Sequence, residues 1–188
     1  MGRACHWSNM VKAKDSNNGL GLARGTVVVR AYEPAWAEAF VAEAARLRGA
    51  LGGLAEHLEH VGSTAVPGLP AKPVIDLALG FADEAALAEL TTRLPALGYA
   101  AFGDQRGDGD WFFALGPGVA RTHYLHAERL GGERWTNYLV FRDRLRADAR
   151  LRDEYARLKT ELAALYPNDR DAYTRGKEAF IRRVLGKS

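Results

Sequence analysis

The triplet Gly62 to Thr64 and two charged residues after it, Lys72 and Asp76, have the chemistry of a phosphate and metal site. Glycine lets a backbone come close to a bulky anion, and the N–H groups that follow, with a Ser or Thr hydroxyl, can donate hydrogen bonds to phosphate oxygens. Asp76 lies in an apolar segment typical of a strand, where its carboxylate can hold Mg²⁺ bridged to phosphates. The Lys72 ammonium adds a point charge nearby. The pattern predicts phosphate binding by Gly62, Ser63, Thr64 and Lys72 and metal binding by Asp76.

An ordinary turn explains part of the same stretch. Pro67-Gly68 fits the two central positions of a type II turn, which needs no ligand. Glycine and serine are common in loops, so a Gly-Ser pair with a distant aspartate is a weak signal by itself. From the residues alone, the turn and the ligand site stay open as alternatives.

A second group of candidates lies on the segment 119–128. If this segment is a strand, alternation places Arg121 and His123 on one face and Tyr124 and His126 on the other. We expect Arg121 and His123 to face the pocket, where an arginine can clamp phosphate and a histidine can move a proton near neutral pH. The two histidines are three residues apart, so they could share a metal ion only across a bulge.

Two further charged residues have two interpretations each. Lys177 shares a helical stripe with Tyr173 and Phe180, so its ammonium either reaches out to water or points into a polar site. The Gly/Asp-rich segment 103–110 lacks the spacing and final Glu of a calcium loop and is interpreted as a solvated hairpin tip. In the alternative interpretation, Asp110 at its end is a displaced acid of the site.

The order of the predicted elements favours a mixed β-sheet covered by helices, with a helical C-terminal segment. Residues 1–25 show neither helical nor alternating periodicity and are predicted to be a disordered or loosely attached extension, which leaves one domain at 26–188. Gly116-Pro117-Gly118 predicts a hairpin. The strands are expected at 26–30, 58–61, 74–81, 99–102, 111–115 and 119–128. The helices are expected from 34 to the Gly52-Gly53 pair and at 83–98, 137–165 and 168–185, and the third is either one continuous helix or two, with a fresh start capped by Asp148.

Composition narrows the class of protein. The net charge of +3 over 188 residues arises within residues 1–25, and the remainder is balanced, so no basic face favours nucleic-acid binding. A small anionic substrate needs only a few positive groups in a pocket. The single cysteine, Cys5, excludes an internal disulfide framework, and no apolar run approaches the length that crosses a bilayer, so we expect a cytoplasmic protein without a membrane partner.

The string GSTAVPGLPAKPVIDL, residues 62–77, resembles the signature of the GrpB family, a group of bacterial proteins in the nucleotidyltransferase superfamily. The resemblance runs from about Val27 to Leu185 and includes the segments 32–36, 121–126, 141–146 and 173–181. It implies an α/β (α+β) fold of nucleotidyltransferase type, with Gly62 and Ser63 as the phosphate loop and Asp76 as the first acid of a metal-binding pair. The resemblance also implies that Arg142 is a phosphate ligand, and the C-terminal segment that contains Lys177 fits the family pattern. The superfamily's second acid is replaced by Ala78.

The leading hypothesis is an enzyme that transfers a nucleotidyl group from a nucleoside triphosphate to a small acceptor with Mg²⁺. Asp76 would hold the metal, Arg121 and Arg142 would stabilise negative charge, and His123 would be the base for the acceptor. Ala78 motivates a non-catalytic module that binds a nucleotide or a coenzyme A-related molecule, because the resemblance extends to domains fused to a coenzyme A biosynthetic kinase. A metal-free acid/base enzyme with His123 and Asp76 as the pair is the third hypothesis.

Overall fold

A five-stranded mixed sheet forms the centre of the computed structural model, which describes residues 19–23, 25–104, 107, 109–116 and 120–187. The strand order is β2-β3-β7-β5-β4, and only the β3–β7 pair is parallel. The strands are β2 (Leu58–Val61), β3 (Ile75–Phe81), β4 (Ala100–Asp104), β5 (Trp111–Leu115) and β7 (His123–Arg129). The predicted mixed sheet covered by helices is confirmed.

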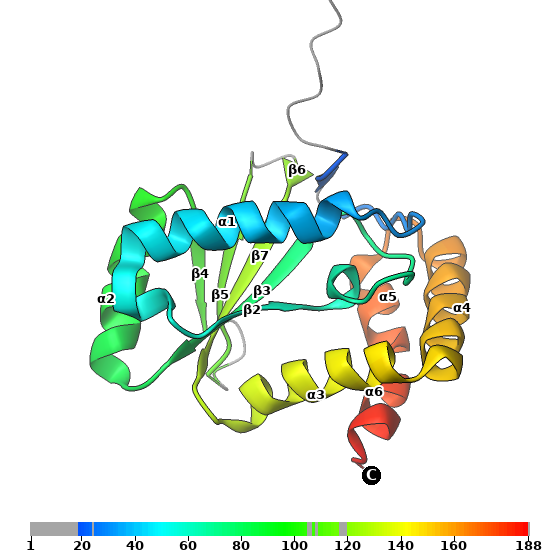
Figure 1. The fold of residues 1–188 in the computed structure, drawn as a ribbon. Coiled ribbons are helices and arrows are strands. Elements are labelled where there is room, and N and C mark those ends of the chain that lie inside the picture. Colours follow the sequence, from blue (N-terminus) through cyan, green and yellow to red (C-terminus); the bar gives the residue numbers. More distant parts are fainter. Residues whose placement is uncertain (1–18, 24, 105–106, 108, 117–119, 188) are drawn as a thin grey trace, which may run out of the picture.

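Helices cover both faces of the sheet, as Figure 1 shows. On one face pack α1 (Ala35–Leu51) and α2 (Glu84–Ala96), and α3 (Glu133–Ala147) crosses the other. The C-terminal helical segment consists of α4 (Ala149–Leu165), α5 (Arg170–Gly176) and α6 (Glu178–Leu185). It packs beside the end of the sheet where β3 begins, so helices and strands enclose the start of that strand. None of the helices in the described residues is long and apolar enough to cross a membrane.

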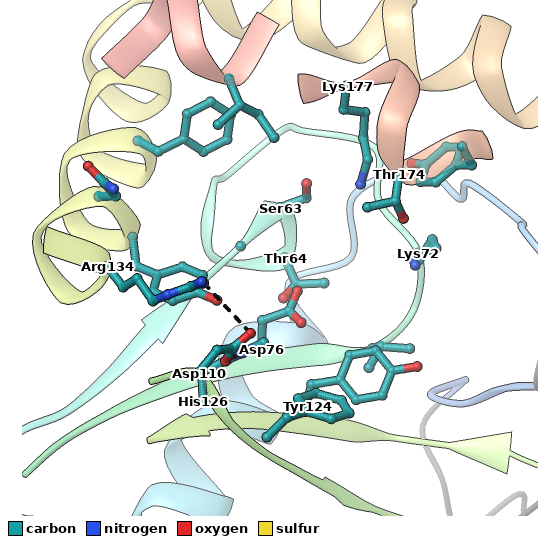
Figure 2. A pocket seen from close by; sticks show the side chains of 18 of the residues that line it. Ser63, Thr64, Lys72, Asp76, Asp110, Tyr124, His126, Arg134, Thr174 and Lys177 are labelled. Carbon is teal, nitrogen blue, oxygen red and sulfur yellow. Dashed lines mark hydrogen bonds and ion pairs between the residues drawn. The ribbon is translucent and has the colours of Figure 1, made fainter. Parts of the chain in front are cut away.

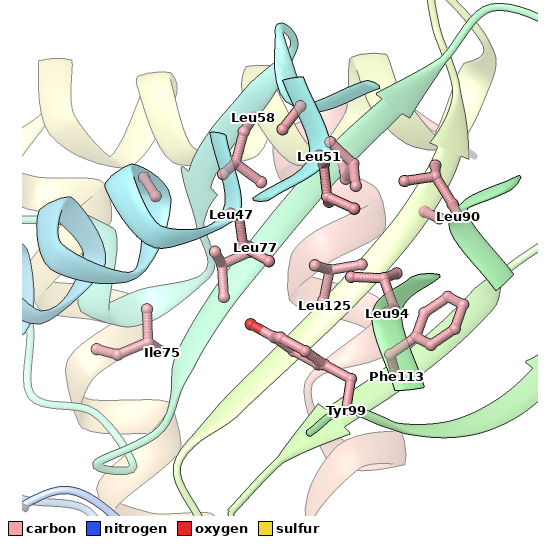
Figure 3. Packing of buried hydrophobic residues seen from close by; sticks show 14 of the residues in the cluster. Leu47, Leu51, Leu58, Ile75, Leu77, Leu90, Leu94, Tyr99, Phe113 and Leu125 are labelled. Carbon is pink, nitrogen blue, oxygen red and sulfur yellow. The ribbon is translucent and has the colours of Figure 1, made fainter. Parts of the chain in front are cut away.

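The main hydrophobic core lies between the sheet and the helices α1 and α2 (Figure 3). Leu47 and Leu51 of α1 pack with Leu77 of β3 and Leu125 of β7, and all four are at most 3% exposed. Burying a leucine side chain contributes about 1.5–3 kcal/mol. This core therefore fixes which face of β3 and β7 is apolar, and the opposite face is left for other side chains.

Local sequence signals account for the helix boundaries next to the sheet. The Asp83 carboxylate accepts a hydrogen bond from the Ala86 N–H at 2.9 Å, which satisfies a free donor at the start of α2. Gly52, with φ of 60°, ends α1 in a conformation that favours glycine. These ends agree with the predicted helix start at 83 and the predicted stop at the Gly52-Gly53 pair.

Two predicted strands differ in the structure. The segment 26–30 forms no strand beyond an isolated bridge from Arg30 to Ala71. The segment 119–128 is interrupted at Thr122, where the short β6 (Ala120–Arg121) leaves the main sheet and pairs with β1 (Leu22–Ala23). The last residues of the predicted N-terminal extension are thus tied to the domain, and residues 1–18 lie outside the described residues.

Candidate functional site

A cavity of about 460 Å³ opens on the face of the sheet opposite α1, between β3, β5, β7 and the helices α3 to α6 (Figure 2). This volume lies within the range of about 300–1,000 Å³ that is usual for small-ligand pockets. Six of the residues predicted to form the site line it: Gly62, Ser63, Thr64, Lys72, Asp76 and Lys177. Segments more than 100 residues apart in sequence, such as the Gly-Ser loop and α5–α6, meet here.

The Gly-Ser loop lies directly against Asp76. Gly62 has φ of 70° and ψ of −169°, a conformation that is essentially restricted to glycine. A Cβ at this position would lie 2.4 Å from Oδ2 and 2.9 Å from Cβ of Asp76. Ser63 then begins the short 3-10 helix η2 (Ser63–Ala65), so backbone N–H groups and a hydroxyl are presented beside the carboxylate. The glycine is therefore what lets the loop and the acid converge.

Two arginines of α3 hold this loop from outside the pocket. The Arg142 guanidinium donates to Oε2 of Glu59 at 2.7 Å and to the carbonyl oxygen of His60 at 3.0 Å. Arg146 donates to the carbonyl oxygen of Ala65 at 2.9 Å. Arg142 does not line the cavity, so the structure does not bring this predicted phosphate ligand into the pocket. Its hydrogen bonds instead fix the position of the loop.

Thr64 is positioned from within the core. Its hydroxyl lies 3.0 Å from Nε2 of His60, and the His60 ring stacks on Phe40 with 4.7 Å between centroids. Burial, with the nearby Arg146 and Arg142, lowers the pKa of His60 to about 3. A neutral His60 can accept a hydrogen bond from the Thr64 hydroxyl. The Thr64 side chain is then used within the protein, and only its backbone can bind a ligand.

Positive groups surround the single carboxylate of Asp76. Burial raises the pKa of Asp76, while His126, Lys72, Lys177 and Arg170 oppose this rise. Lys72, Lys177 and Arg170 all line the same cavity as Asp76. These three cationic side chains outnumber the single carboxylate of Asp76. This part of the pocket therefore carries excess positive charge, which suits an anionic ligand.

Both lysines lie near the same aromatic ring. Their ammonium nitrogens lie 5.5 Å (Lys72) and 4.5 Å (Lys177) from the centroid of the Tyr173 ring. Burial, then the charge of Lys72, lowers the pKa of Lys177 to about 8, although Asp76 opposes the change. Burial and then Arg170 also lower the pKa of Lys72. A phosphate between them would relieve this repulsion, because like charges in a desolvated site destabilise each other.

Aromatic side chains line the rest of the cavity. The Phe112 ring lies 5.2 Å from the rings of Tyr124 and His126, and His126 lies 5.1 Å from Tyr138. All four residues line the cavity. Ring faces of this kind stack on planar heterocycles such as nucleobases, with about 1–3 kcal/mol per base. The pocket thus combines a cationic region with an aromatic wall.

The predicted location of His123 is wrong. Its neighbours in alternation, Leu125 and Ala127, belong to the core on the α1 side, and His123 does not line the cavity. Its Nδ1 lies 2.9 Å from the hydroxyl of Thr122, and burial lowers its pKa. His123 therefore does not face Asp76, and the acid/base pair of these two residues is not formed.

Arg121 lies in a small recess beside the cavity. Lys72, Tyr124 and Arg170 line both spaces, and the Arg121 guanidinium lies 4.4 Å from the centroid of the Phe102 ring. The break in the strand at Thr122 accounts for this position, because β6 pairs with β1 instead of continuing along β5. Arg121 is thus near the pocket but does not line its main volume.

The sequence already indicates which residues of this strand face the cavity in place of His123. Leu125 and Ala127 are apolar, whereas Tyr124, His126 and Glu128 are polar, so alternation alone indicates that the second set leaves the core. The register confirms this, because Asp76 is paired with Tyr124, and Ala78 with His126. Arg170 and Thr174, by contrast, reach the cavity only through packing of the C-terminal helices, which no local pattern indicates.

Comparison with known proteins agrees with this architecture. A family model described as GrpB protein matches residues 26–187. A UPF0157 protein of Pseudomonas aeruginosa is 43% identical over 162 residues, which cover 83% of this chain and 65% of that protein. A dephospho-CoA kinase of Mycolicibacterium paratuberculosis is 29% identical over 187 residues, 86% of this chain and 46% of that protein. The chain spans about two thirds of the first relative and about half of the second.

Among solved structures, the crystal structure of the conserved protein GrpB from Enterococcus faecalis is similar to this chain, with a TM-score of 0.77 and 32% identity. The match covers 85% of this chain and 95% of that one.

Proposed function

The chain belongs to the GrpB family, and from this premise we propose that its pocket binds a nucleoside triphosphate with Mg²⁺ and transfers the nucleotidyl group to a small acceptor. The observation that carries the proposal is the contact between the Gly62 loop and Asp76 at the cationic end of the cavity. An anion held there meets backbone donors, a metal ligand and several positive charges together. The aromatic wall supplies a place for the base.

The phosphates would be held by the loop and the cations. Ser63 and the N–H groups after Gly62 donate hydrogen bonds, while Lys72, Lys177 and Arg170 neutralise charge. Because Lys177 has a pKa of about 8, its ammonium is mostly protonated at neutral pH and can pair with an anion that enters the pocket. In the transferring step these groups stabilise the negative charge that develops on the leaving pyrophosphate.

The donor set around Asp76 fits a magnesium ion that arrives with the nucleotide. Mg²⁺ usually takes one or two carboxylates, keeps several waters and completes its shell with substrate phosphates. Asp76 provides one carboxylate beside the loop, and Ala78 provides none. When bound, the ion would neutralise charge on the phosphates. Asp76 would orient it and keep it next to the loop.

The test is magnesium-dependent release of pyrophosphate from nucleoside triphosphates, measured with a panel of small acceptors. We expect release with the wild-type chain, and at least a hundredfold loss in Asp76→Asn and Lys177→Met. Asp171→Asn and Lys187→Met are matched controls, since Asp171 is exposed and Lys187 pairs with Glu133 away from the cavity. Absence of release with every nucleotide and acceptor would contradict the transfer reaction.

A non-catalytic binding module is the second candidate, and Ala78 together with the similarity to a dephospho-CoA kinase favours it. In that case the same cations bind the phosphates of ATP, GTP, dephospho-CoA or CoA without turnover. Thermal unfolding with each ligand, with and without Mg²⁺, distinguishes the two. Stabilisation that is the same without Mg²⁺ and in Asp76→Asn supports the binding module. Stabilisation that requires both Mg²⁺ and the Asp76 carboxylate supports the transferase.

A further inference from the structure

Three side chains converge at the far side of the cavity from the lysines, and the nucleotide site uses only one of them, His126, as part of its aromatic wall. A carboxylate oxygen of Asp110, a ring nitrogen of His126 and a carboxylate oxygen of Glu128 all lie within 4.8 Å of one another. We propose that these residues bind a divalent transition-metal ion such as Zn²⁺ or Mn²⁺, at a site that does not use the carboxylate of Asp76. The proposal does not depend on the nucleotide reaction.

The sheet register accounts for the convergence. His126 and Glu128 are two residues apart on β7 and therefore share a face of the sheet. Trp111 of β5 pairs with Ala127, so Asp110, one residue earlier, is placed opposite Glu128. β7 thus presents two ligands from rigid backbone, and the third, Asp110, is the last loop residue before β5. A ligand on a strand holds its geometry better than one on a loop.

The distances suit a small metal ion. Nδ1 of His126 lies 3.1 Å from Oδ1 of Asp110. Ligand atoms at about 2.0–2.2 Å from a tetrahedral Zn²⁺ are separated from each other by roughly 3.4 Å. The His126–Asp110 hydrogen bond therefore spans nearly the distance of one edge of such a site, and an ion could replace the shared proton with small shifts of the side chains.

Burial makes a cation favourable here. Glu128 is 2% exposed, and the side chains of Asp110 and His126 are 13% and 16% exposed. Two carboxylates in so dry a place need positive charge nearby. Arg134 supplies part of it, with Nη1 at 3.8 Å from Oδ2 of Asp110. The Arg134 side chain is 29% exposed and starts in the first turn of α3.

The ligand types indicate the class of ion. An imidazole with two carboxylates suits Zn²⁺, Mn²⁺ and related ions better than Mg²⁺, which prefers oxygen ligands alone. Asp110 and His126 line the cavity, while Glu128 lies beneath it. Three protein ligands leave a coordination position that faces the cavity, which is the arrangement of zinc sites that bind a water or a substrate atom.

The test is a titration of the metal-stripped full chain with Zn²⁺, Mn²⁺ and Mg²⁺ by calorimetry, with Co²⁺ absorption as a reporter of coordination. Cys5 and His6 are also ligand types, so all variants carry Cys5→Ser and His6→Gln. We expect one Zn²⁺ or Mn²⁺ per chain, bound at least about 100-fold more tightly than Mg²⁺. His126→Gln and Glu128→Gln should each weaken binding by more than about 100-fold, since loss of a residue that only hydrogen-bonds to a metal ligand already costs about 10- to 100-fold.

Two controls separate this site from the others. Asp76→Asn should leave Zn²⁺ affinity within about threefold of wild type, and so should the exposed Glu161→Gln. Asp110→Asn keeps the shape of the site if Glu128→Gln fails to fold, and it too should weaken binding. Zn²⁺ and Mn²⁺ binding that is absent, or that survives His126→Gln and Asp110→Asn, would overturn the proposal. Loss of binding in Asp76→Asn would also overturn it, by assigning the ion to the nucleotide site.

Discussion

Substitution of Gly62 by alanine tests whether close approach of the loop to Asp76 is essential. The new Cβ would lie 2.4 Å from Oδ2 and 2.9 Å from Cβ of Asp76, at a backbone φ of 70°. The backbone conformation costs roughly 1–3 kcal/mol for a residue with a side chain. Ordinary contact between heavy atoms is about 3.5–4.0 Å, so the loop or the carboxylate must also move by on the order of 1 Å.

Ligand affinity should therefore suffer as well as stability. A misplacement of about 1 Å in a positioned site can cost about 100-fold in rate. We expect Gly62→Ala to lower the free energy of unfolding by about 1–3 kcal/mol and to weaken ATP–Mg²⁺ binding by about 100-fold or more. Urea denaturation and calorimetry measure the two quantities.

Gly53→Ala is the matched control, because nothing lies within 4 Å of a Cβ there and the residue is exposed. It should leave both quantities nearly unchanged. A Gly62→Ala, Asp76→Gly double variant should recover part of the stability lost in Gly62→Ala, since the clashing side chain is gone. If Gly62→Ala behaves like Gly53→Ala in both measurements, the reasoning about the loop is refuted.

Three further predictions follow from single contacts. Lys177 is an ammonium below its pKa of about 8, so the affinity for an anion should be highest below pH 8 and should fall as the pH rises through 8. Calorimetry across pH 6–10 measures this fall in affinity, which should be smaller in Lys177→Met. Arg142→Ala should lower the free energy of unfolding in urea by about 1–3 kcal/mol, because the His60 carbonyl loses its hydrogen-bond donor. It should also weaken ligand binding, although Arg142 does not line the cavity. Unchanged ligand affinity would contradict a role for Arg142 in placing the loop. Tyr99→Phe should cost about 1–3 kcal/mol of unfolding free energy by removing the 2.7 Å hydrogen bond to the buried Glu43, with ligand affinity intact.

The elements that depend on local signals were predictable. The Gly62-Ser63 turn, the strand that carries Asp76 and the Asp83 cap are each set by residues close in sequence, and the structure has all three. The convergence of Gly62 with Asp76 followed from a strand–loop–strand reading, because β2 and β3 are adjacent and antiparallel.

Features that depend on distant packing were not predictable from local pattern. Arg142 is paired with Glu59, 83 residues away, and alternation along one strand cannot indicate that contact. The family motif and the proton-transfer chemistry of histidine favour a pocket-facing His123, but the burial of Leu125 on the same face places His123 on the core side. The break at Thr122, where the chain leaves the sheet to pair with Leu22–Ala23, depends on an N-terminal segment that carries little periodicity.

The most direct test of the central claim is a crystal structure of this chain with Mg²⁺ and a non-hydrolysable ATP analogue. The account predicts that the phosphates lie against the backbone N–H groups that follow Gly62 and between Lys72 and Lys177, with the ion bound by Asp76. A nucleotide bound elsewhere, or phosphates that contact neither the loop nor Asp76, would contradict it.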